Sequence, residues 1–256
     1  MIVCVAVIQH VLGRPVNLED KLFIIRRRPD FVCLPEYCFI GPDCDGMVQA
    51  ARAARENMAV IERLSADLST TVIGGSIVIP TEGGLANTTM VFSRGRLLGS
   101  YQKMNLYGKE SARGVVPGKK VVAFDIAGTR IGVLICADVL DPNSFRELRK
   151  LQVDIIFVPT TSPYRPEDTP YDKQLRDNEI FVRGAQLANA YVVKAGGVGT
   201  LFGHRLQGRS GVFAPWGILA KVKIEDENCR RVLFAQLDLD EIREFKQKMT
   251  FAVPAH

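Results

Sequence analysis

The chain has 256 residues, of which 47% are hydrophobic and 24% are charged, and its formal net charge is +5. This composition is typical of a packed globular protein rather than a disordered or fibrous one, and the length fits one α/β domain over residues 1–256. The positive charge is scattered, and its densest cluster, Arg26–Arg28, falls at the end of a predicted helix, where the dipole favours cations. We therefore expect no nucleic-acid partner, since such an interface needs a basic stripe interleaved with aromatic residues.

The chain begins with a short apolar run, and no later segment of the sequence approaches the length of a membrane span. Ile2–Ile8 has no basic residues before it and is too short for a secretory signal or a transmembrane helix. We therefore expect a cytoplasmic protein without a membrane partner, in which the six cysteines stay reduced.

Apolar strands and helix signals alternate in the first half of the chain. The first elements predicted are strand Ile2–Ile8, helix Asn17–Arg28, strand Phe31–Leu34, helix Gly46–Ser69 and strand Thr71–Ile79. Two hairpins follow, Asn87–Ser93 with Leu97–Gln102, and Val121–Ile126 with Thr129–Cys136, which turn at Arg94-Gly95 and Ala127-Gly128.

The second half repeats this plan. Its elements are helix Pro142–Leu151 with Asp141 as N-cap, strand Ile155–Val158, helix Tyr171–Asn189, strand Val192–Ala195, hairpin Arg209–Ala214 with Ile218–Lys223, strand Val232–Leu237 and a short last helix. The Pro-rich stretch Pro159–Pro170 is predicted to be a loop, either at the mouth of a site or as a plain connection. Alternating helices and strands with several hairpins indicate an α/β protein with mixed sheets faced by helices.

Cys136 stands where a predicted strand meets a predicted helix. The apolar run Ile131–Ile135 leads directly into the thiol, and the helix capped by Asp141 begins a few residues later. Such an elbow lifts a side chain above the sheet edge, where a helix N-terminus and free backbone N–H groups favour a thiolate and a developing oxyanion. Cys136 is therefore a candidate nucleophile, although its spacing alone is equally compatible with a buried, inert thiol.

An acid and an amine also stand at strand ends. Glu36 follows the apolar strand Phe31–Leu34, and Lys103 follows Leu97–Gln102. The carboxyl ends of strands are where α/β proteins place their sites, and Glu36 is a candidate general base because no histidine is a sequence neighbour of Cys136. Each residue taken alone is also compatible with a solvated surface position.

Together these segments resemble the nitrilase, or carbon–nitrogen hydrolase, superfamily over nearly the whole chain. Leu34-Pro35-Glu36 is similar to the family's base motif, Tyr101–Leu106 to its lysine motif and Gly132–Asp138 to its nucleophile motif. Glu110, before Pro117-Gly118, resembles the second, structural glutamate. The resemblance implies an α-β-β-α sandwich in which two packed mixed sheets have helices outside.

The resemblance also implies roles for individual residues. Glu36 would take the proton of Cys136, the sulfur would attack an amide carbonyl, and Lys103 with the Ala137 N–H would hold the oxyanion. Glu110 would position Lys103 or a substrate amine, and Asp138, in the nucleophile motif, would support the site. This chemistry requires neither a metal nor an organic cofactor.

Departures from the family pattern bear on the substrate. Ala137-Asp138 follows Cys136, where nitrilases carry Trp-Glu, so an amidase acting on a small linear amide is favoured over a nitrilase. Hydrolysis of N-carbamoyl compounds uses the same thiol attack and remains open. From another class, a non-catalytic ligand-binding or interaction protein on the same fold is the alternative.

The remaining partners follow from the same reasoning. A zinc site built from Cys33, Cys38 and Cys44 has no nearby histidine and no regular ligand spacing, so we expect no metal. The partner implied is a small-molecule amide substrate. The family resemblance further implies a homodimer or larger homo-oligomer.

Overall fold

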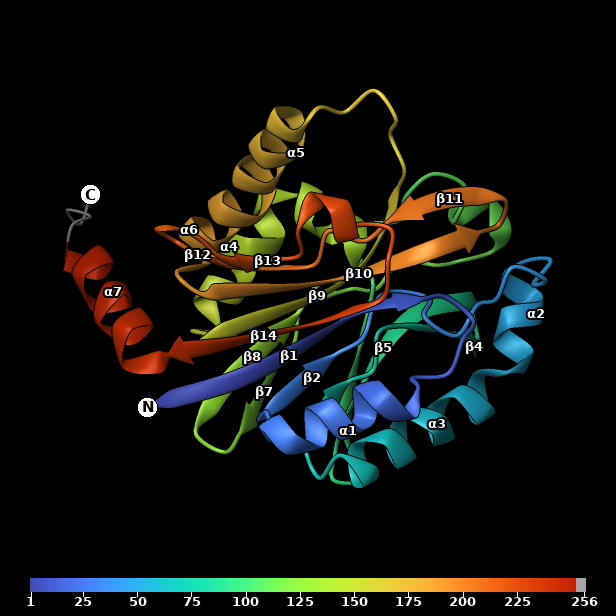
Figure 1. Cartoon of the computed structure of the whole chain (residues 1–256), viewed down its shortest axis with the longest axis horizontal. Coiled ribbons are helices and arrows are strands. Elements are labelled where there is room, and N and C mark those ends of the chain that lie inside the picture. The colour runs from blue at the N-terminus through green and yellow to red at the C-terminus, as the bar shows by residue number, and fades with distance from the viewer. Residues whose placement is uncertain (252–256) are drawn as a thin grey trace.

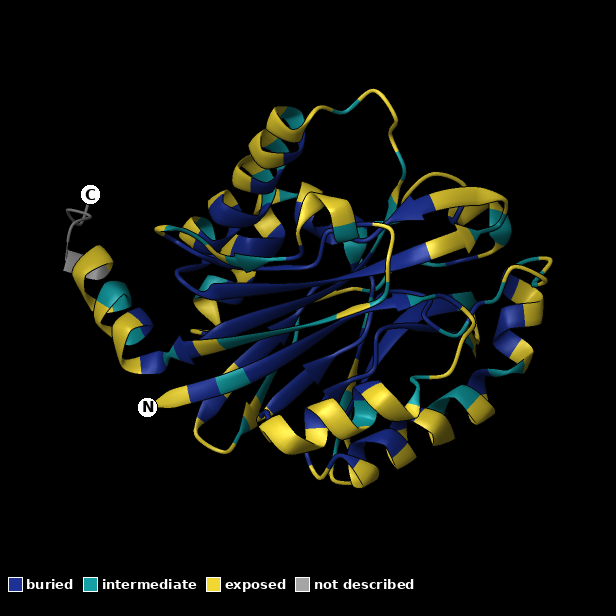
Figure 2. Cartoon of the chain, viewed as in Figure 1, coloured by how far each residue is buried: buried dark blue, intermediate teal, exposed yellow. Residues whose placement is uncertain are grey.

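Two mixed β-sheets lie face to face in the protein, and helices cover their outer faces (Figure 1). The structure, a computed structural model, describes residues 1–251, the last two of these by their backbone alone. The buried strands form the interior and the helices alternate between buried and exposed residues (Figure 2). The α-β-β-α sandwich predicted from the sequence is therefore confirmed.

The first sheet is built around three parallel strands from the start of the chain. Its strands are β1 (Ile2–Val11), β2 (Phe31–Cys33), β3 (Thr71–Ile73), β4 (Ile77–Thr81), β5 (Gly84–Ser93), β6 (Arg96–Gln102) and β14 (Arg231–Asp238). β1, β2 and β3 run parallel, β14 pairs antiparallel with β1, and β5 pairs with β3, β4 and β6.

The second sheet repeats the arrangement with the next three parallel strands. Its strands are β7 (Ala123–Ile126), β8 (Thr129–Val133), β9 (Ile155–Pro163), β10 (Tyr191–Leu201), β11 (His204–Gln207), β12 (Gly211–Ala214) and β13 (Gly217–Lys221). β8, β9 and β10 run parallel, as β1, β2 and β3 do. The two sheets meet where His10 of β1 pairs with Gly197 of β10.

Each sheet has its own group of helices on its outer face. The first sheet carries α1 (Leu18–Arg27), α2 (Met47–Arg52) and α3 (Ala54–Asp67); the second carries α4 (Pro142–Lys150), α5 (Pro170–Asp177) and α6 (Arg183–Ala188), and α7 (Leu239–Phe251) lies at the end of the sandwich (Figure 1). The predicted N-cap of α4 is confirmed, since the Asp141 side chain accepts a hydrogen bond from the N–H of Asn143. Because both faces of each sheet are covered, strands such as Ile155–Val158 are apolar throughout.

Two elements predicted as continuous are interrupted. The helix predicted at Gly46–Ser69 breaks at Ala53, because α2 packs on a small cluster beside β4 whereas α3 packs on the main core under the first sheet. The strand predicted at Thr71–Ile79 breaks at Gly75, which has φ +64°. A Cβ at Gly75 would lie 2.1 Å from the carbonyl oxygen of Pro35, so only glycine allows this close approach.

The prediction of a loop at Pro159–Pro170 is wrong for its first part. β9 continues to Pro163, because its backbone pairs with β10 on one side and with β11, which the sequence analysis missed. Pro159 has no N–H to donate, yet its carbonyl can still accept a hydrogen bond within the sheet. The helix predicted at Tyr171–Asn189 is continuous but contains a π-helical turn at Asn178–Val182.

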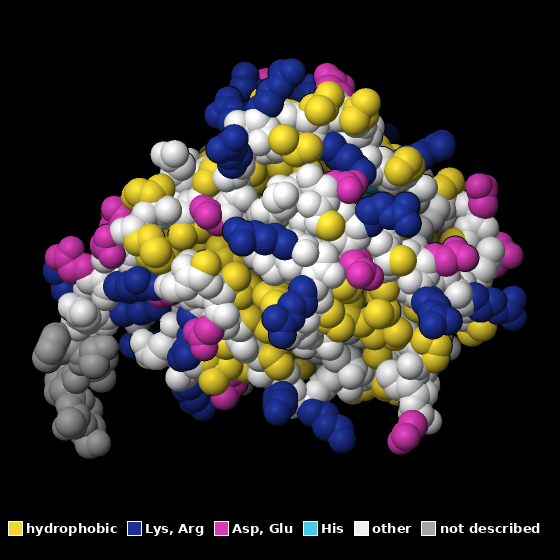
Figure 3. Space-filling model, turned by 90° about the horizontal axis from the view of Figure 1, so that it is seen from below, with side chains coloured by type: hydrophobic (Ala, Val, Ile, Leu, Met, Phe, Trp, Pro, Cys, Tyr) yellow, Lys and Arg dark blue, Asp and Glu magenta, His cyan; other side chains and the backbone are white. Residues whose placement is uncertain are grey.

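Neither a membrane-spanning helix nor, on the face seen in Figure 3, a basic stripe is found in the described part of the chain. Among residues 1–251, no helix is long and apolar enough to cross a membrane. On the face covered by α1 and α3, lysine and arginine side chains are dispersed among apolar and polar ones (Figure 3).

Candidate active site

The strand β2 delivers Glu36 to the edge of the first sheet. β2 is fully buried, and the N–H of Leu34 still donates to the carbonyl of Ile73 at 3.0 Å, which holds the following residues against β3. The chain then turns at Tyr37, whose φ is +52° and whose N–H donates to Ser76. Glu36 is thereby fixed with its side chain almost completely buried.

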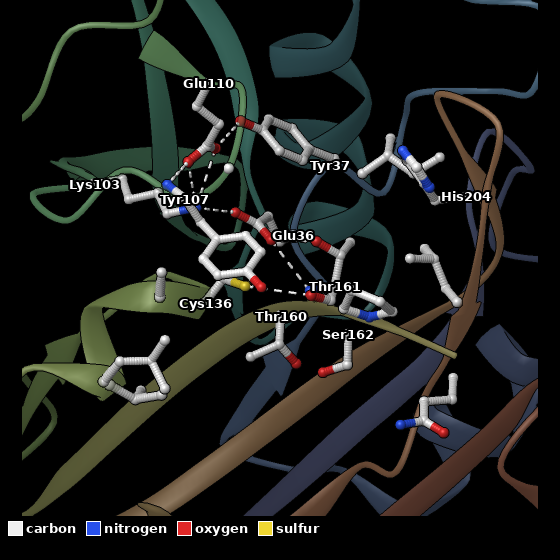
Figure 4. A pocket seen from close by; sticks show the side chains of 18 of the residues that line it. Glu36, Tyr37, Lys103, Tyr107, Glu110, Cys136, Thr160, Thr161, Ser162 and His204 are labelled. Carbon is white, nitrogen blue, oxygen red and sulfur yellow. Dashed lines mark hydrogen bonds and ion pairs between the residues drawn. The ribbon is translucent and has the colours of Figure 1, made fainter. Parts of the chain in front are cut away.

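Lys103 lies between two carboxylates. Its Nζ donates to Glu36 Oε1 at 2.8 Å and to both oxygens of Glu110, at 3.0 and 2.9 Å (Figure 4). Burial disfavours the charged form of Lys103, but Glu36, Cys136 and Glu110 outweigh it and raise the Lys103 pKa above its ordinary value. The buried amine is therefore a permanent cation held by two anions.

The carboxylate of Glu110 accepts hydrogen bonds from several residues. Its oxygens accept from the Tyr37 hydroxyl at 2.5 Å, from the Asn87 side chain at 3.2 Å and from the N–H of Tyr107 at 2.7 Å, in addition to Lys103. Burial alone would raise the Glu110 pKa, but Lys103 and these hydrogen bonds lower it. Asn87 also donates to Glu36 at 2.9 Å and so joins the two carboxylates.

Cys136 occupies the strand-to-helix elbow predicted for it. β8 ends at Val133, three residues before the thiol, and the short 3₁₀ helix η2 (Cys136–Leu140) starts at the thiol itself. Cys136 has φ +45°, a conformation that costs a non-glycine residue roughly 1–3 kcal/mol and is concentrated at functional sites. The N–H of Ala137 lies in the first turn of η2, where helical N–H groups have no intrahelical acceptor.

Thr161 on β9 links the thiol to the base. Its carbonyl accepts from Cys136 Sγ at 3.3 Å, while its N–H and hydroxyl donate to Glu36 Oε2 at 3.1 and 2.5 Å (Figure 4). Burial and the Glu36 charge, opposed by Lys103, raise the pKa of Cys136 to about 12. Burial and the Glu36 charge therefore oppose the thiolate that the helix N-terminus at the elbow favours.

Asp138 braces the elbow against the lysine strand and does not line the cavity. Its Oδ1 accepts from the N–H groups of Met104 and Asn105, at 3.1 and 2.7 Å. Its Oδ2 accepts from the Tyr101 hydroxyl and the Ile135 N–H, both at 2.8 Å. This single buried carboxylate ties the segment that carries Lys103 to the segment that carries Cys136.

Glu36, Lys103, Glu110, Cys136 and Ala137 all line one cavity of about 460 Å³. Its walls come from both sheets and from the α5–α6 segment, and the extension of β9 beyond Pro159 forms part of them. The structure thus brings the residues predicted for the site into one cavity, with the exception of Asp138, which lies behind it. Sequence reasoning missed Thr161, Asn87 and Tyr37, although a buried asparagine inside a predicted hairpin was a possible signal for Asn87.

Cys33, Cys38 and Cys44, the cysteines weighed above as zinc ligands, each lie against a backbone carbonyl. The thiols of Cys33, Cys38 and Cys44 face the carbonyls of Leu34, Gly74 and Gly46 respectively. Residues 1–251 contain no group of three or more His, Cys, Asp or Glu side chains placed to hold a metal ion.

The sequence also matches a known family. The family model for carbon–nitrogen hydrolases matches residues 16–247. The chain belongs to the carbon–nitrogen hydrolase family. It is accordingly an enzyme that hydrolyses carbon–nitrogen bonds, and the resemblance noted in its motifs is confirmed.

Individual relatives of this carbon–nitrogen hydrolase include amidases. It is 24% identical to the deaminated glutathione amidase of Synechocystis sp. over 94% of this chain and 93% of the relative. It is 27% identical to the glutamine-dependent NAD(+) synthetase of Acinetobacter baylyi over 61% of this chain, but it spans only 31% of that longer protein. The crystal structure of a carbon–nitrogen hydrolase from Helicobacter pylori G27 superposes with a TM-score of 0.83 at 18% identity, covering 100% of this chain and 96% of the other.

Proposed function

We propose that the enzyme is a thiol amidase that cleaves a small linear amide through a covalent thioester on Cys136. The observation that carries the proposal is the hydrogen-bonded group of Glu36, Lys103 and Glu110 beside the Cys136 elbow, inside one cavity. The relationship to a deaminated glutathione amidase supports an amide as the substrate.

The first half of the reaction breaks the carbon–nitrogen bond. Glu36 takes the thiol proton as Cys136 Sγ attacks the amide carbonyl carbon, since the thiol itself is neutral at rest. The Lys103 ammonium and the Ala137 N–H stabilise the oxyanion of the tetrahedral intermediate. Protonated Glu36 then gives the proton to the leaving nitrogen, ammonia or an amine departs, and a thioester remains.

The second half restores the enzyme. Glu36 removes a proton from water, which attacks the thioester carbonyl, and the collapse of the second oxyanion intermediate releases the carboxylic acid and the Cys136 thiol. Glu110 keeps Lys103 charged and fixed throughout, because its two oxygens both accept from the ammonium. Tyr37 and Asn87 hold Glu110 and Glu36 in turn.

The test combines a variant with a trapped intermediate. Cys136→Ala should abolish ammonia release from propionamide while the melting temperature stays near that of the wild type. Intact-protein mass spectrometry of the acid-quenched wild type should show a propionyl adduct that Cys136→Ala lacks. The control is Cys229→Ala, because Cys229 is exposed and outside the cavity. Wild-type turnover in Cys136→Ala would overturn the proposal.

The same cavity could accept N-carbamoyl compounds or nitriles, since the attack by sulfur is common to all three. A parallel assay with an N-carbamoyl amino acid and with propionitrile separates them, and the proposal predicts the highest kcat/KM for an amide. The expected homo-oligomeric state and cytoplasmic location stand as further predictions, checked by native mass spectrometry and cell fractionation.

A further inference from the structure

Lys194 is a buried lysine that the proposed reaction does not use. It lies in the middle of β10, is 2% exposed and lines the same cavity as Cys136. Cys136 is close enough for its charge to influence the Lys194 pKa. The ammonium of Lys194 therefore shares the cavity with the proposed nucleophile.

Lys194 differs from the other fully buried cations of the cavity, Lys103 and Arg209, in forming no ion pair within residues 1–251. Lys103 is held by Glu36 and Glu110, as described above. Arg176 forms a bidentate pair with Asp168, at 2.5 and 2.8 Å, and Arg209 pairs with Asp177 at 2.6 Å. Within residues 1–251, by contrast, no acceptor forms a hydrogen bond or an ion pair with Lys194 Nζ.

Among the described residues, the polar contact of this ammonium is a cation–π contact with an aromatic ring. Nζ lies 4.9 Å from the centroid of Phe181, in the π-helical turn of the α5–α6 segment that covers β10 (Figure 1). A cation–π contact offsets only part of the free-energy cost of burying an ammonium that has no anion against it. Accordingly burial, opposed by Asp177, lowers the Lys194 pKa to about 8.

We propose that Lys194 is the specificity-determining residue of this enzyme and binds a carboxylate at the far end of the amide substrate. This inference rests on the proposed amidase function and narrows its substrate class to amides that carry a second, anionic end. Lys194 already lies in the cavity, desolvated and unpaired, so an incoming carboxylate would find a donor that needs little further reorganisation.

A second polar group of the cavity also lacks a partner. The side-chain oxygen of Gln207 on β11 is buried without a hydrogen bond from any described residue, and Gln207 lines the same cavity as Lys194. The exposed cations Lys109 and Arg165 lie at the rim and add to the positive potential. Charge and unused hydrogen-bonding capacity thus point to a polar, anionic ligand.

Strand order limits the length of that ligand. The elbow with Cys136 follows β8, and Lys194 lies on β10, with β9 between them. Two strand spacings put these backbones roughly 10 Å apart. Because Cys136 and Lys194 line the same cavity, a short linear amide with a terminal carboxylate suits this scale. Succinamate and glutaramate have this form.

The experiment compares a charged amide with a neutral one of the same shape. Succinamate and 4-methylpentanamide differ in that a carboxylate replaces an isopropyl group. The wild type should prefer succinamate by at least about 10-fold in kcat/KM, and Lys194→Met should lower kcat/KM for succinamate by about 10- to 100-fold, mainly through KM. The same variant should leave 4-methylpentanamide within about twofold, and its melting temperature should not fall, since loss of an unpaired buried charge is not destabilising.

The matched control is Lys150→Met, because Lys150 is an exposed lysine on α4 outside the cavity. It should leave both substrates unchanged. Equal losses on both substrates in Lys194→Met would mean a structural role, and no loss on either would mean that no anion binds there; either outcome overturns the proposal. If Lys194→Met does not fold, a wild type that hydrolyses 4-methylpentanamide as well as succinamate overturns it without the variant.

A binding measurement separates failure of this inference from failure of the amidase function. Titration calorimetry of succinamate into Cys136→Ala, and into Cys136→Ala with Lys194→Met, requires no turnover. Binding that weakens at least 10-fold without Lys194 supports the carboxylate site even if neither amide is hydrolysed by the wild type. Equal binding with and without Lys194, or no binding to either variant, overturns it even if the wild type is an amidase.

Discussion

The carbonyl of Thr161 accepts the hydrogen bond of the Cys136 thiol at 3.3 Å. The same residue donates to Glu36 through both its N–H and its hydroxyl. Nucleophile and base are therefore held by one residue of β9, and Glu36 lies close enough to the thiol for its charge to raise the Cys136 pKa. This contact makes the roles of the two groups testable.

Glu36→Gln should make Cys136 more reactive toward iodoacetamide while it abolishes amide turnover. Burial and, after it, the Glu36 charge raise the Cys136 pKa to about 12; removal of that charge leaves burial opposed by Lys103, which lowers the pKa and increases the thiolate fraction between pH 7 and 9. Alkylation is followed by intact-protein mass spectrometry against pH. A Glu36→Gln variant that alkylates more slowly than the wild type, or that retains its amidase rate, would contradict the assignment of Glu36 as base.

Thr161→Val should slow the chemical step by about 10-fold or more, because loss of one hydrogen bond to a charged group costs about 1.5–3 kcal/mol. Valine has the shape of threonine and keeps the backbone contacts to Cys136 and Glu36, so only the hydroxyl contact of 2.5 Å is removed. Single-turnover kinetics measure the effect. Thr200→Val, on the exposed end of β10, serves as control. Equal rates for both variants would exclude a positioning role for the hydroxyl.

Glu110→Gln should destabilise the protein at neutral pH by an amount that vanishes in acid. The Glu110 pKa is lowered in the folded state from its ordinary value of 4.5, so its stabilising contribution is complete above that value and is lost as pH falls through the lower, folded pKa. The difference in unfolding free energy between wild type and variant should be constant from pH 8 to about 5 and shrink below 4.5. Urea titrations at each pH measure it.

The control for this series is Glu82→Gln, a change at an exposed residue that should show no such pH dependence. If the difference in unfolding free energy between wild type and Glu110→Gln grows on acidification, the Glu110 pKa is raised rather than lowered by folding.

Asp138→Asn should destabilise the fold by about 2–4 kcal/mol, since an amide offers one acceptor oxygen and would leave buried donors of the Asp138 shell unpaired. The variant should also lose activity, because this shell ties the segment carrying Lys103 to the one carrying Cys136. Chemical denaturation and kcat measure the two effects. Asp141→Asn is the matched control, since asparagine caps a helix as well as aspartate does. A stability of Asp138→Asn equal to that of the control would exclude the brace.

Local patterns were sufficient to predict the order of the main strands and helices. Alternation of apolar strands and capped helices predicted the repeated β-α-β-α-β plan, and the elbow at Cys136 followed from an apolar strand that runs into a capped helix. Element boundaries failed where tertiary contacts override local preference. β9 passes through Pro159 because β10 and β11 pair with it, and the break at Gly75 exists because the carbonyl of Pro35 lies against it.

The sequence by itself determined which residues end strands with an acid, an amine and a sulfur, because periodicity, capping and turn residues act over a few positions. Only the tertiary structure decided how these ends meet. The protonated state of Cys136 depends on burial and on Glu36, a hundred residues away in the chain, and the isolation of Lys194 depends on Arg176 and Arg209 having their own carboxylates. In the sequence Lys194 is a single polar residue in an apolar strand. Within residues 1–251 no anion is in hydrogen-bond or ion-pair contact with its Nζ, and that is a property of packing.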